Sequence, residues 1–231
     1  MNNLLRNYIN SVLLNEKAVS IMQAQNESIA CFVSINKNFP KIVLYDTTKV
    51  KSFVDVVKFD NSIIGMIELA SCHGDVPSYG AYEVKYAAAN QGYGPLLYDI
   101  AMSEYGAIIS DRDGEVSNFA RKIWKYYFTS RPDVLKLHLD DYENPQTPDR
   151  DDDGQIYDPA TSENYLNYAY KCTQKIDITA MKQKHLACVD KFRNFKSKGL
   201  FEDALGIEAL GFFGKKYRDV TDMTVNHGFV P

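Results

Sequence analysis

Hydrophobic and polar positions along the first third of the chain have spacings that predict one helix followed by strands. Residues 2–18 carry apolar side chains at helical spacing, which predicts a helix. The strand-like runs that follow are separated by turn residues, so the first two runs are expected to form a hairpin. The predicted strands are residues 28–35, 41–46 and 63–70; residues 50–59 fit helix and strand equally, and residues 72–80 predict a loop.

The middle of the chain has the most regular pattern. A predicted strand over residues 82–89 leads into a glycine-rich turn over residues 90–94 and then into a helix over residues 95–105. Pro95 suits the first turn of this helix, and Gly106 suits its end. A short strand, a helix and another strand follow at residues 107–110, 118–129 and 134–139. This alternation predicts an α/β fold.

The helix predicted over residues 118–129 has a cap and an apolar face. Ser117 precedes it and carries a hydroxyl that can accept a hydrogen bond from the first turn. The apolar stripe that we expect to face the core consists of Phe119, Ile123, Trp124 and Tyr127.

The pattern changes after residue 140. Residues 140–164 are acidic and contain three prolines, which predicts a long loop, and residues 165–231 carry mostly helical signals. The best helix candidates there are residues 181–196 and 200–210. We therefore expect an α/β domain over residues 1–140 and, over residues 141–231, an acidic loop and a mainly helical extension packed on that domain.

Composition and charge narrow the function classes. The 231 residues are 45% hydrophobic and 24% charged, which is typical of a globular domain with a substantial core. A formal net charge of -4 argues against a protein that coats nucleic acid. The chain has neither the roughly 20-residue apolar run of a membrane helix nor a secretory signal pattern, so we expect a cytoplasmic protein. Its four cysteines are widely spaced, which favours reduced thiols over disulfides or zinc ligands.

The glycine turn is the most informative local motif. The turn has the sequence NQGYGP and lies between a predicted strand and a predicted helix. Its glycines allow a ligand to approach the backbone, and the start of the helix offers unpaired N–H groups. This arrangement favours an anionic group such as a phosphate or pyrophosphate. The turn lacks the patterns of a P-loop and of a dinucleotide-binding fold. Glycines also occur in such turns for purely structural reasons.

The segment from Val84 to Ala101, VKYAAANQGYGPLLYDIA, resembles the acyl-CoA-binding segment of the GNAT superfamily of N-acetyltransferases, in particular GNAT-like proteins of tailed phages. The resemblance implies a mixed, mostly antiparallel central sheet flanked by helices and splayed beside the strand that ends near Ala89. It also implies acetyl-CoA as a co-substrate, with Gln91, Gly92, Tyr93, Gly94 and Leu96 around its pyrophosphate. Leu96 stands where the family has Gly or Ala, and Pro95 removes one N–H donor.

The resemblance further implies which residues carry the chemistry. Backbone N–H groups of Tyr86, Ala87 and Ala88 would meet the thioester oxygen, at a position where the family has a β-bulge. A general base would be Glu83 or Glu68, for each of which a surface carboxylate is the structural alternative. The acid that protonates the leaving thiolate would be Tyr126, Tyr127 or Ser117, although Tyr127 also belongs to the apolar stripe.

The acidic loop contains a possible calcium motif. Asp149, Asp151 and Asp153, followed by Gly154, match the first part of an EF-hand loop. Position 12 is Ala160 instead of the glutamate that such loops need, so a solvated acidic loop is the favoured interpretation, and we expect no resident metal.

These observations lead to two functional hypotheses. The first is an acyl-CoA-dependent N-acyltransferase that acts on an unidentified amine in the cytoplasm, or in the host cytoplasm or virion if the chain is phage-encoded. The second is a GNAT-like scaffold without catalysis that serves as a binding or virion-associated protein. Both hypotheses are compatible with a homodimer.

Overall fold

The computed structural model describes residues 19–34, 40–53, 56–59, 61–71, 80–111, 116–139 and 163–192, together with Leu205. Several predicted features lie outside these residues. They are the helix over residues 2–18, nearly all of the loop over residues 72–80, the acidic run with Asp149, Asp151 and Asp153, and the helix over residues 200–210 apart from Leu205.

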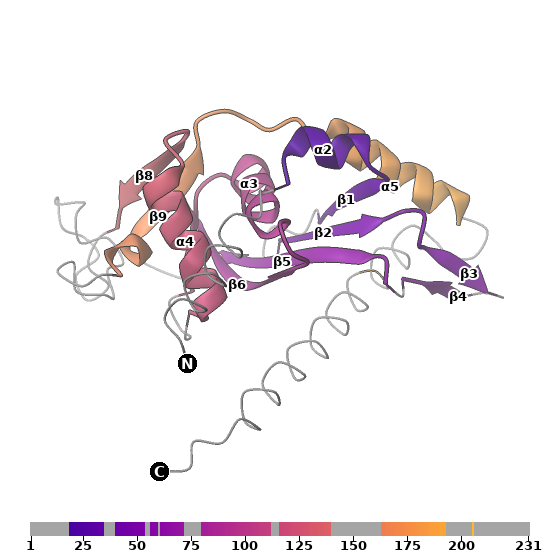
Figure 1. The fold of residues 1–231 in the computed structure, drawn as a ribbon, viewed down its shortest axis with the longest axis horizontal. Helices are drawn as coiled ribbons and strands as arrows, with labels where there is room; N and C mark the ends of the chain where they lie inside the picture. Colours follow the sequence, from indigo (N-terminus) through magenta and orange to yellow (C-terminus); the bar gives the residue numbers. More distant parts are fainter. Residues whose placement is uncertain are drawn as a thin grey trace, which may run out of the picture.

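A seven-stranded sheet forms the centre of the protein (Figure 1). Its strand order is β1-β2-β5-β6-β7-β9-β8, and β6 and β7 are the parallel pair among antiparallel neighbours. The strands are β1 (Ile29–Val33), β2 (Lys41–Asp46), β5 (Ile63–Ser71), β6 (Tyr82–Ala89), β7 (Ile108–Ile109), β8 (Val134–His138) and β9 (Tyr168–Cys172). The ambiguous stretch over residues 50–59 contains two short strands, β3 (Lys51–Phe53) and β4 (Val56–Lys58), which pair with each other. The predicted α/β fold with a mixed, mostly antiparallel sheet is confirmed.

Helices flank this sheet (Figure 1). The structure places α3 (Gly94–Tyr105) and α4 (Asn118–Ser130) directly after β6 and β7, in the predicted order. A short α2 (Ile21–Asn26) precedes β1, and α5 (Thr179–Lys191) packs closely on β1. A 3-10 turn, η1 (Asn164–Asn167), leads into β9.

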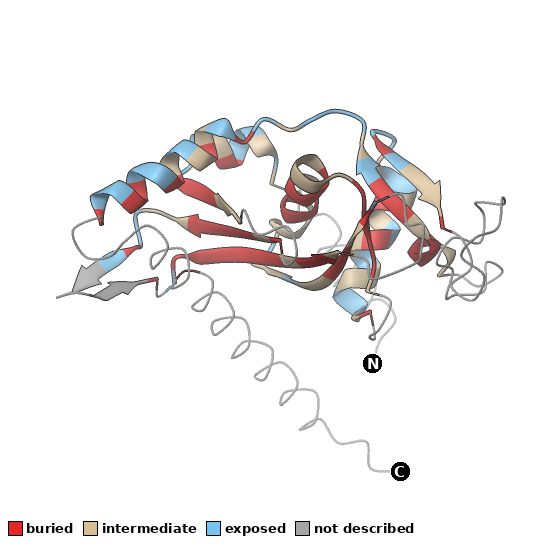
Figure 2. Cartoon of the chain, turned by 180° about the vertical axis from the view of Figure 1, so that it is seen from behind, coloured by how far each residue is buried: buried red, intermediate tan, exposed pale blue. Residues whose placement is uncertain are grey.

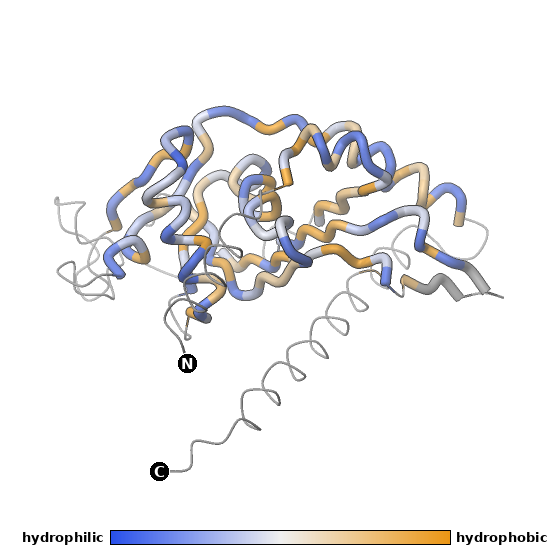
Figure 3. The backbone as a smooth tube through the Cα atoms, in the orientation of Figure 1, coloured by the Kyte–Doolittle hydropathy of each residue, from blue (hydrophilic) through white to orange (hydrophobic). Residues whose placement is uncertain are grey.

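Alternation along the strands divides the core between the two faces of the sheet. In β1 and β2, Cys31 and Leu44 belong to the cluster with α3, whereas Ala30, Val43 and Tyr45 belong to a second cluster with α5. Both sets are buried, as the red strands in Figure 2 and the hydrophobic strands in Figure 3 show. The outer side of α5 is exposed and polar, so this helix covers the sheet with one side only.

Local helix signals predicted the boundaries of α3 and α4. The Ser117 hydroxyl accepts a hydrogen bond from the Ala120 N–H at 3.2 Å, and Gly106, with a φ of 93°, ends α3. The apolar stripe of α4 was predicted correctly at Trp124 and Tyr127, which are buried, but wrongly at Phe119, which is 72% exposed. Phe119 lies in the first turn, where one flank of the helix faces solvent.

The C-terminal region differs most from expectation. We expected the part of residues 141–231 beyond the acidic loop to be mainly helical and to pack on a sheet complete at residue 140, yet β9 lies inside the sheet between β7 and β8. The sequence YAYKC gives no clear alternation, because the adjacent residues Ala169 and Tyr170 are both buried, in separate core clusters on the two faces of the sheet. The helix predicted over residues 181–196 is present as α5 up to Lys191, and residues 193–196 lie outside the described residues. No helix among the described residues has the length and apolarity needed to cross a membrane.

Candidate functional site

The sheet opens between β6 and β7. These parallel strands pair only at their beginnings, where Tyr82 is opposite Ile108 and Glu83 is opposite Ile109. Beyond this point β6 continues to Ala89 alongside β5, whereas β7 ends. Among the described residues, no strand pairs with the second half of β6 on the side away from β5. We refer to this stretch along the second half of β6, on the side away from β5, as the β6–β7 opening.

A β-bulge lies at the closed end of this opening. The register between β5 and β6 shifts between Glu68 and Leu69, whose partners on β6 are Tyr86 and Val84, so Lys85 is the extra residue. The Lys85 Nζ lies 2.9 Å from Glu83 Oε1 and 3.0 Å from Asp111 Oδ1. Since Glu83 and Ile109 are the last paired residues, Lys85 and Asp111 occupy the next level along the two strands. A side-chain bridge thus takes the place of the backbone ladder where the strands part.

The backbone beyond the bulge faces the opening at every second residue. The Asn90 N–H donates to the Ile64 carbonyl at 2.7 Å, which makes Asn90 a residue hydrogen-bonded to β5. By the alternation of antiparallel pairing, Ala88 and Tyr86 also direct their backbone groups to β5, and Ala87 directs its N–H and carbonyl to the other edge. Of the three residues predicted to meet a thioester, Ala87 is therefore the one whose N–H faces the opening.

The glycine turn after β6 presents unpaired backbone donors. Gly92 has a φ of 84°, a conformation that favours glycine, and its carbonyl accepts a hydrogen bond from the Val19 N–H. Within the described part of the chain, the N–H groups of Gly92, Gly94 and Leu96 form no hydrogen bond. The Tyr93 N–H, which we had included among the donors, instead donates to the Asn90 carbonyl at 3.1 Å and closes the turn. Three of the four predicted backbone donors thus remain available.

Packing explains two residues of this turn. A Cβ on Gly94 would lie 2.9 Å from Ile123 Cδ1, so the absence of a side chain there allows α4 to approach α3. Leu96, the departure from the family pattern, is 2% exposed and points into the core, so its side chain does not occupy the space beside its N–H. Gln91 is exposed at the rim of the turn.

The Tyr93 side chain anchors the turn to the neighbouring helix. Its hydroxyl donates to Glu27 Oε2 at 3.0 Å. Burial, reinforced by the bond to Glu27, raises the pKa of Tyr93 to about 12. This phenol stays protonated at neutral pH and donates to Glu27, so it fixes the turn against the end of α2.

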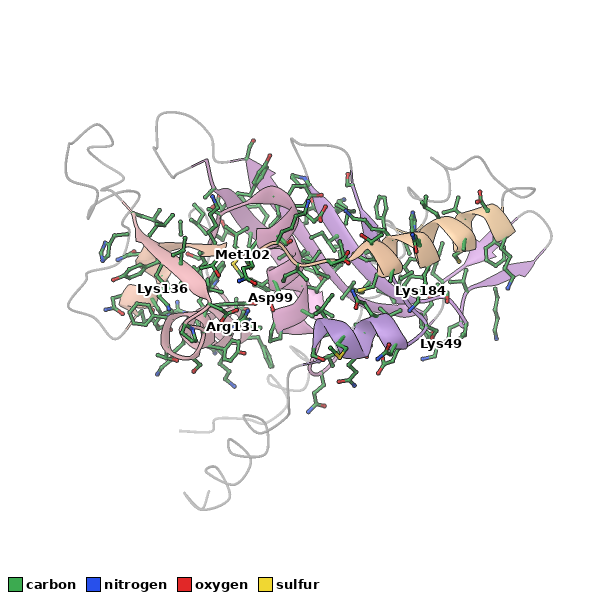
Figure 4. The ribbon with its side chains drawn as sticks, turned by 90° about the horizontal axis from the view of Figure 1, so that it is seen from above. Lys49, Asp99, Met102, Arg131, Lys136 and Lys184 are labelled. Atoms are coloured by element: carbon green, nitrogen blue, oxygen red, sulfur yellow. The ribbon has the colours of Figure 1, made fainter. Side chains whose placement is uncertain are left out.

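A buried polar network joins α3 to the end of α4. The Tyr127 hydroxyl lies 2.8 Å from the Pro95 carbonyl and 2.8 Å from Asp99 Oδ1. Arg131 NH1 donates to both carboxylate oxygens of Asp99, at 2.9 and 3.0 Å, and the two residues lie side by side in Figure 4. Burial and the Asp99 carboxylate raise the pKa of Tyr127 well above its usual value of 10. These contacts give Tyr127 a structural role.

The other predicted catalytic residues are distributed over several elements. Ser117 is occupied as the cap of α4. Tyr126 is half-buried, and its ring contacts in the described part of the chain are with Tyr127 and Arg131. Glu68 lies on β5, opposite Tyr86 and 3.3 Å from Lys41 Nζ, whereas Glu83 lies at the closed end of the opening. The structure thus places Glu83, and not Glu68, beside the β6–β7 opening.

Sequence reasoning missed Lys85 and Asp111. The sequence contains a signal for one of them, because Glu83 and Lys85 are charged residues two apart in an otherwise apolar strand. Asp111 carries no such signal, since its proximity to Lys85 depends on the parallel pairing of β6 and β7. Comparisons with protein-family models, with curated proteins and with solved structures found no match for this chain.

Proposed function

We propose that this protein is an acyl-CoA-dependent N-acyltransferase, with acetyl-CoA as the expected donor and an amine as the acceptor. The observation that carries the proposal is the glycine turn after β6, where the N–H groups of Gly92, Gly94 and Leu96 form no hydrogen bond among the described residues, together with the end of the β6–β7 pairing after Glu83 and Ile109. A long ligand with amide groups and an anionic end suits this path, because it can pair with the strand edge as an added strand would.

Each part of this path would bind a different part of acyl-CoA, the acyl donor. Acyl-CoA would supply an acyl group activated as a thioester. The N–H groups at the start of α3 would bind the pyrophosphate, aided by the positive end of the helix dipole. The Ala87 N–H would donate to the thioester oxygen and stabilise the negative charge that develops there.

The carboxylate of Glu83 is our candidate for the general base. It is 8% exposed and already in contact with an ammonium group, that of Lys85, which is the kind of group from which a base must take a proton. Tyr126 remains our candidate for the acid, because the hydroxyls of Tyr127 and Ser117 are engaged elsewhere. Replacing Glu83 by Gln should lower turnover by about 10²–10⁴-fold, whereas Glu68→Gln should have little effect.

A scaffold without catalysis is the second candidate. It is favoured by the ion pair that already occupies Glu83 and by the hydrogen bonds of Tyr127 and Ser117. The two candidates differ in one outcome: a scaffold binds CoA, or no nucleotide at all, and transfers no acyl group to any amine in a broad panel.

Calorimetric titration with CoA tests the binding step. Gln91→Glu adds a negative charge at the exposed rim of the turn without backbone strain, and a unit charge at close range in water costs about 1 kcal/mol. We expect the affinity for CoA to fall about fivefold. The matched control is Gln174→Glu, which adds the same charge at an exposed residue between β9 and α5 and should bind CoA like the wild type. Failure of the wild type to bind CoA at millimolar concentration would refute the proposal.

A further inference from the structure

The residues on either side of helix α2 hold the glycine turn at two points. Before the helix, the Val19 N–H donates to the Gly92 carbonyl at 3.1 Å. After the helix, the carboxylate of Glu27 accepts a hydrogen bond from the Tyr93 hydroxyl at 3.0 Å. The position of the turn therefore depends on where α2, and Glu27 at its C-terminal end, are held.

Helix α2 depends on other elements for its own position. It consists of six residues, and a helix of that length is unstable unless other parts of the protein pack against it. The last carbonyl groups of a helix also lack partners within the helix. A basic side chain in the last turn can bind them, but α2 has no basic residue there. Its C-terminal end therefore needs a donor from elsewhere in the chain.

Lys184 of α5 supplies this donor. Its Nζ donates to the Gln25 carbonyl at 2.6 Å and also to the Glu27 carbonyl. Figure 4 shows Lys184 on α5 next to α2. The ammonium group also interacts favourably with the negative end of the helix dipole. The backbone of Glu27 is thus held by α5, while its side chain holds the turn through Tyr93.

We propose that Lys184 is a positioning residue of the glycine turn: by holding Glu27 it keeps Tyr93, and with Tyr93 the unpaired N–H groups of the turn, in the geometry that binds acyl-CoA. For its ligand, this inference rests on the proposed function. Lys184 acts through α2 and not by contact with the ligand. A turn that is already held in place loses less conformational freedom when a ligand binds, and ordering costs of this kind correspond to about threefold to tenfold in affinity.

Lys182 provides a matched control on the same helix. Its Nζ lies 2.6 Å from Glu104 Oε2, in the last turn of α3. Glu104 is about 15 Å along the helix from Gly94, at which α3 begins. Lys182→Met therefore removes a contact of α5, as Lys184→Met does, but at the end of α3 that is distant from the turn.

Calorimetric titration of the full chain with CoA tests the role of Lys184. We expect Lys184→Met, which keeps an unbranched apolar side chain and loses the donors, to weaken CoA binding about threefold to tenfold. Lys184→Arg should restore most of the affinity, because a guanidinium group can also donate to two carbonyls. Lys182→Met should bind CoA like the wild type. Equal losses for Lys182→Met and Lys184→Met would indicate a general effect of α5 and would refute the proposal.

A double-substitution cycle shows whether Lys184 acts through Tyr93. Tyr93→Phe removes only the hydroxyl that donates to Glu27, and it should weaken CoA binding as Lys184→Met does. Adding Lys184→Met to Tyr93→Phe should then cause little further loss, whereas additive losses would contradict the connection through Glu27. Both single variants should fold, because the bond from Gln25 Nε2 to the Asp177 carbonyl, at 2.6 Å, still joins α2 to the segment before α5.

Hydrogen exchange separates the positioning role from the proposed function. The Tyr93 N–H donates to the Asn90 carbonyl and closes the turn, so its exchange rate reports how firmly the turn is held without any ligand. We expect this amide, followed by NMR, to exchange at least about threefold faster in Lys184→Met and at the wild-type rate in Lys182→Met.

The two measurements together distinguish the possible failures. If the wild type binds CoA and Lys184→Met changes neither the affinity nor the exchange rate, the positioning role is wrong and the proposed function stands. If the wild type binds no CoA but the exchange rate rises as expected, the proposed function is wrong and Lys184 still positions the turn.

Discussion

Removing the hydroxyl of Tyr127 should destabilise the protein, whereas removing the hydroxyl of its neighbour Tyr126 should not. The two substitutions, Tyr127→Phe and Tyr126→Phe, delete the same atom from adjacent residues of α4. The Tyr127 hydroxyl contacts the Pro95 carbonyl and Asp99, and within the described residues the Tyr126 hydroxyl forms no hydrogen bond. The pair therefore isolates the contribution of the polar network between α3 and α4.

The magnitude follows from the contacts. One hydroxyl proton serves two acceptors, so the loss amounts to one hydrogen bond to a charged group, about 1.5–3 kcal/mol. Asp99 keeps its two hydrogen bonds from Arg131 NH1, at 2.9 and 3.0 Å, which reduces the penalty of leaving its carboxylate unsatisfied. We therefore expect Tyr127→Phe to lower the free energy of unfolding by about 1–2 kcal/mol, and Tyr126→Phe to change it by less than about 0.5 kcal/mol.

Denaturant unfolding, followed by tryptophan fluorescence, measures both values, since Trp124 is the single tryptophan and lies in the same helix. A shift of the midpoint with an unchanged m-value would mean that the native structure lost stability. Equal midpoints for the two variants would refute the assignment of Tyr127 to the network. If Tyr126 is the catalytic acid, its variant should also lose about 10²–10⁴-fold in turnover while remaining stable.

Three further predictions concern packing, the pH dependence of stability and thiol reactivity. Gly65→Ala would place a Cβ 2.8 Å from Leu97 Cδ1 and 3.1 Å from Ala89 Cβ, which should cost about 1–3 kcal/mol of stability; adding Leu97→Ala should cost less than the sum of the two single changes if that clash is the cause. Burial acts to raise the pKa of Asp46, but hydrogen bonds from Thr48 and Ser28 outweigh it and lower that pKa. The stabilisation that the Asp46 carboxylate provides is therefore present above about pH 4 and lost as pH falls through the folded-state pKa. Asp46→Asn should remove that part of the acid sensitivity of folding, and an unchanged pH profile of stability would contradict this. Burial raises the pKa of the Cys31 thiol to about 12, so alkylation by iodoacetamide at pH 8 should leave Cys31 unmodified until the protein unfolds; rapid labelling of the native protein at Cys31 would disprove it.

Features encoded by neighbouring residues were predictable from the sequence. Ser117 and Gly106 mark helix ends by chemistry that acts within one turn, and the strand over residues 82–89 was predicted at both ends. Features that depend on distant partners were not. The strand β9 is defined by its pairing with β7 and β8, as in the contact of Ile108 with Tyr170, and its own five residues contain no decisive pattern.

In the candidate site, too, local features were predictable and features that depend on distant partners were not. The glycine turn and its position between strand and helix could be predicted, because both are properties of a short segment. The choice between Glu83 and Glu68 could not, because it depends on where the pairing of β6 with β7 ends among the described residues. The role of Tyr127 as a network residue also required the structure, since its partner Asp99 is on another helix. The acyltransferase function itself stays a prediction.

The position of β9 has a consequence for synthesis of the protein on the ribosome. The strands β6 and β7 are complete once residue 109 has emerged, but β7 consists of two residues and its second neighbour is β9, which is made some sixty residues later. Until then the nascent chain exposes the edge of β7 that faces away from β6, and an unpaired strand edge makes premature association a hazard. A chain truncated at residue 140 would remain in that state permanently, so the segment after the acidic loop is needed to close the sheet and not merely to cover it.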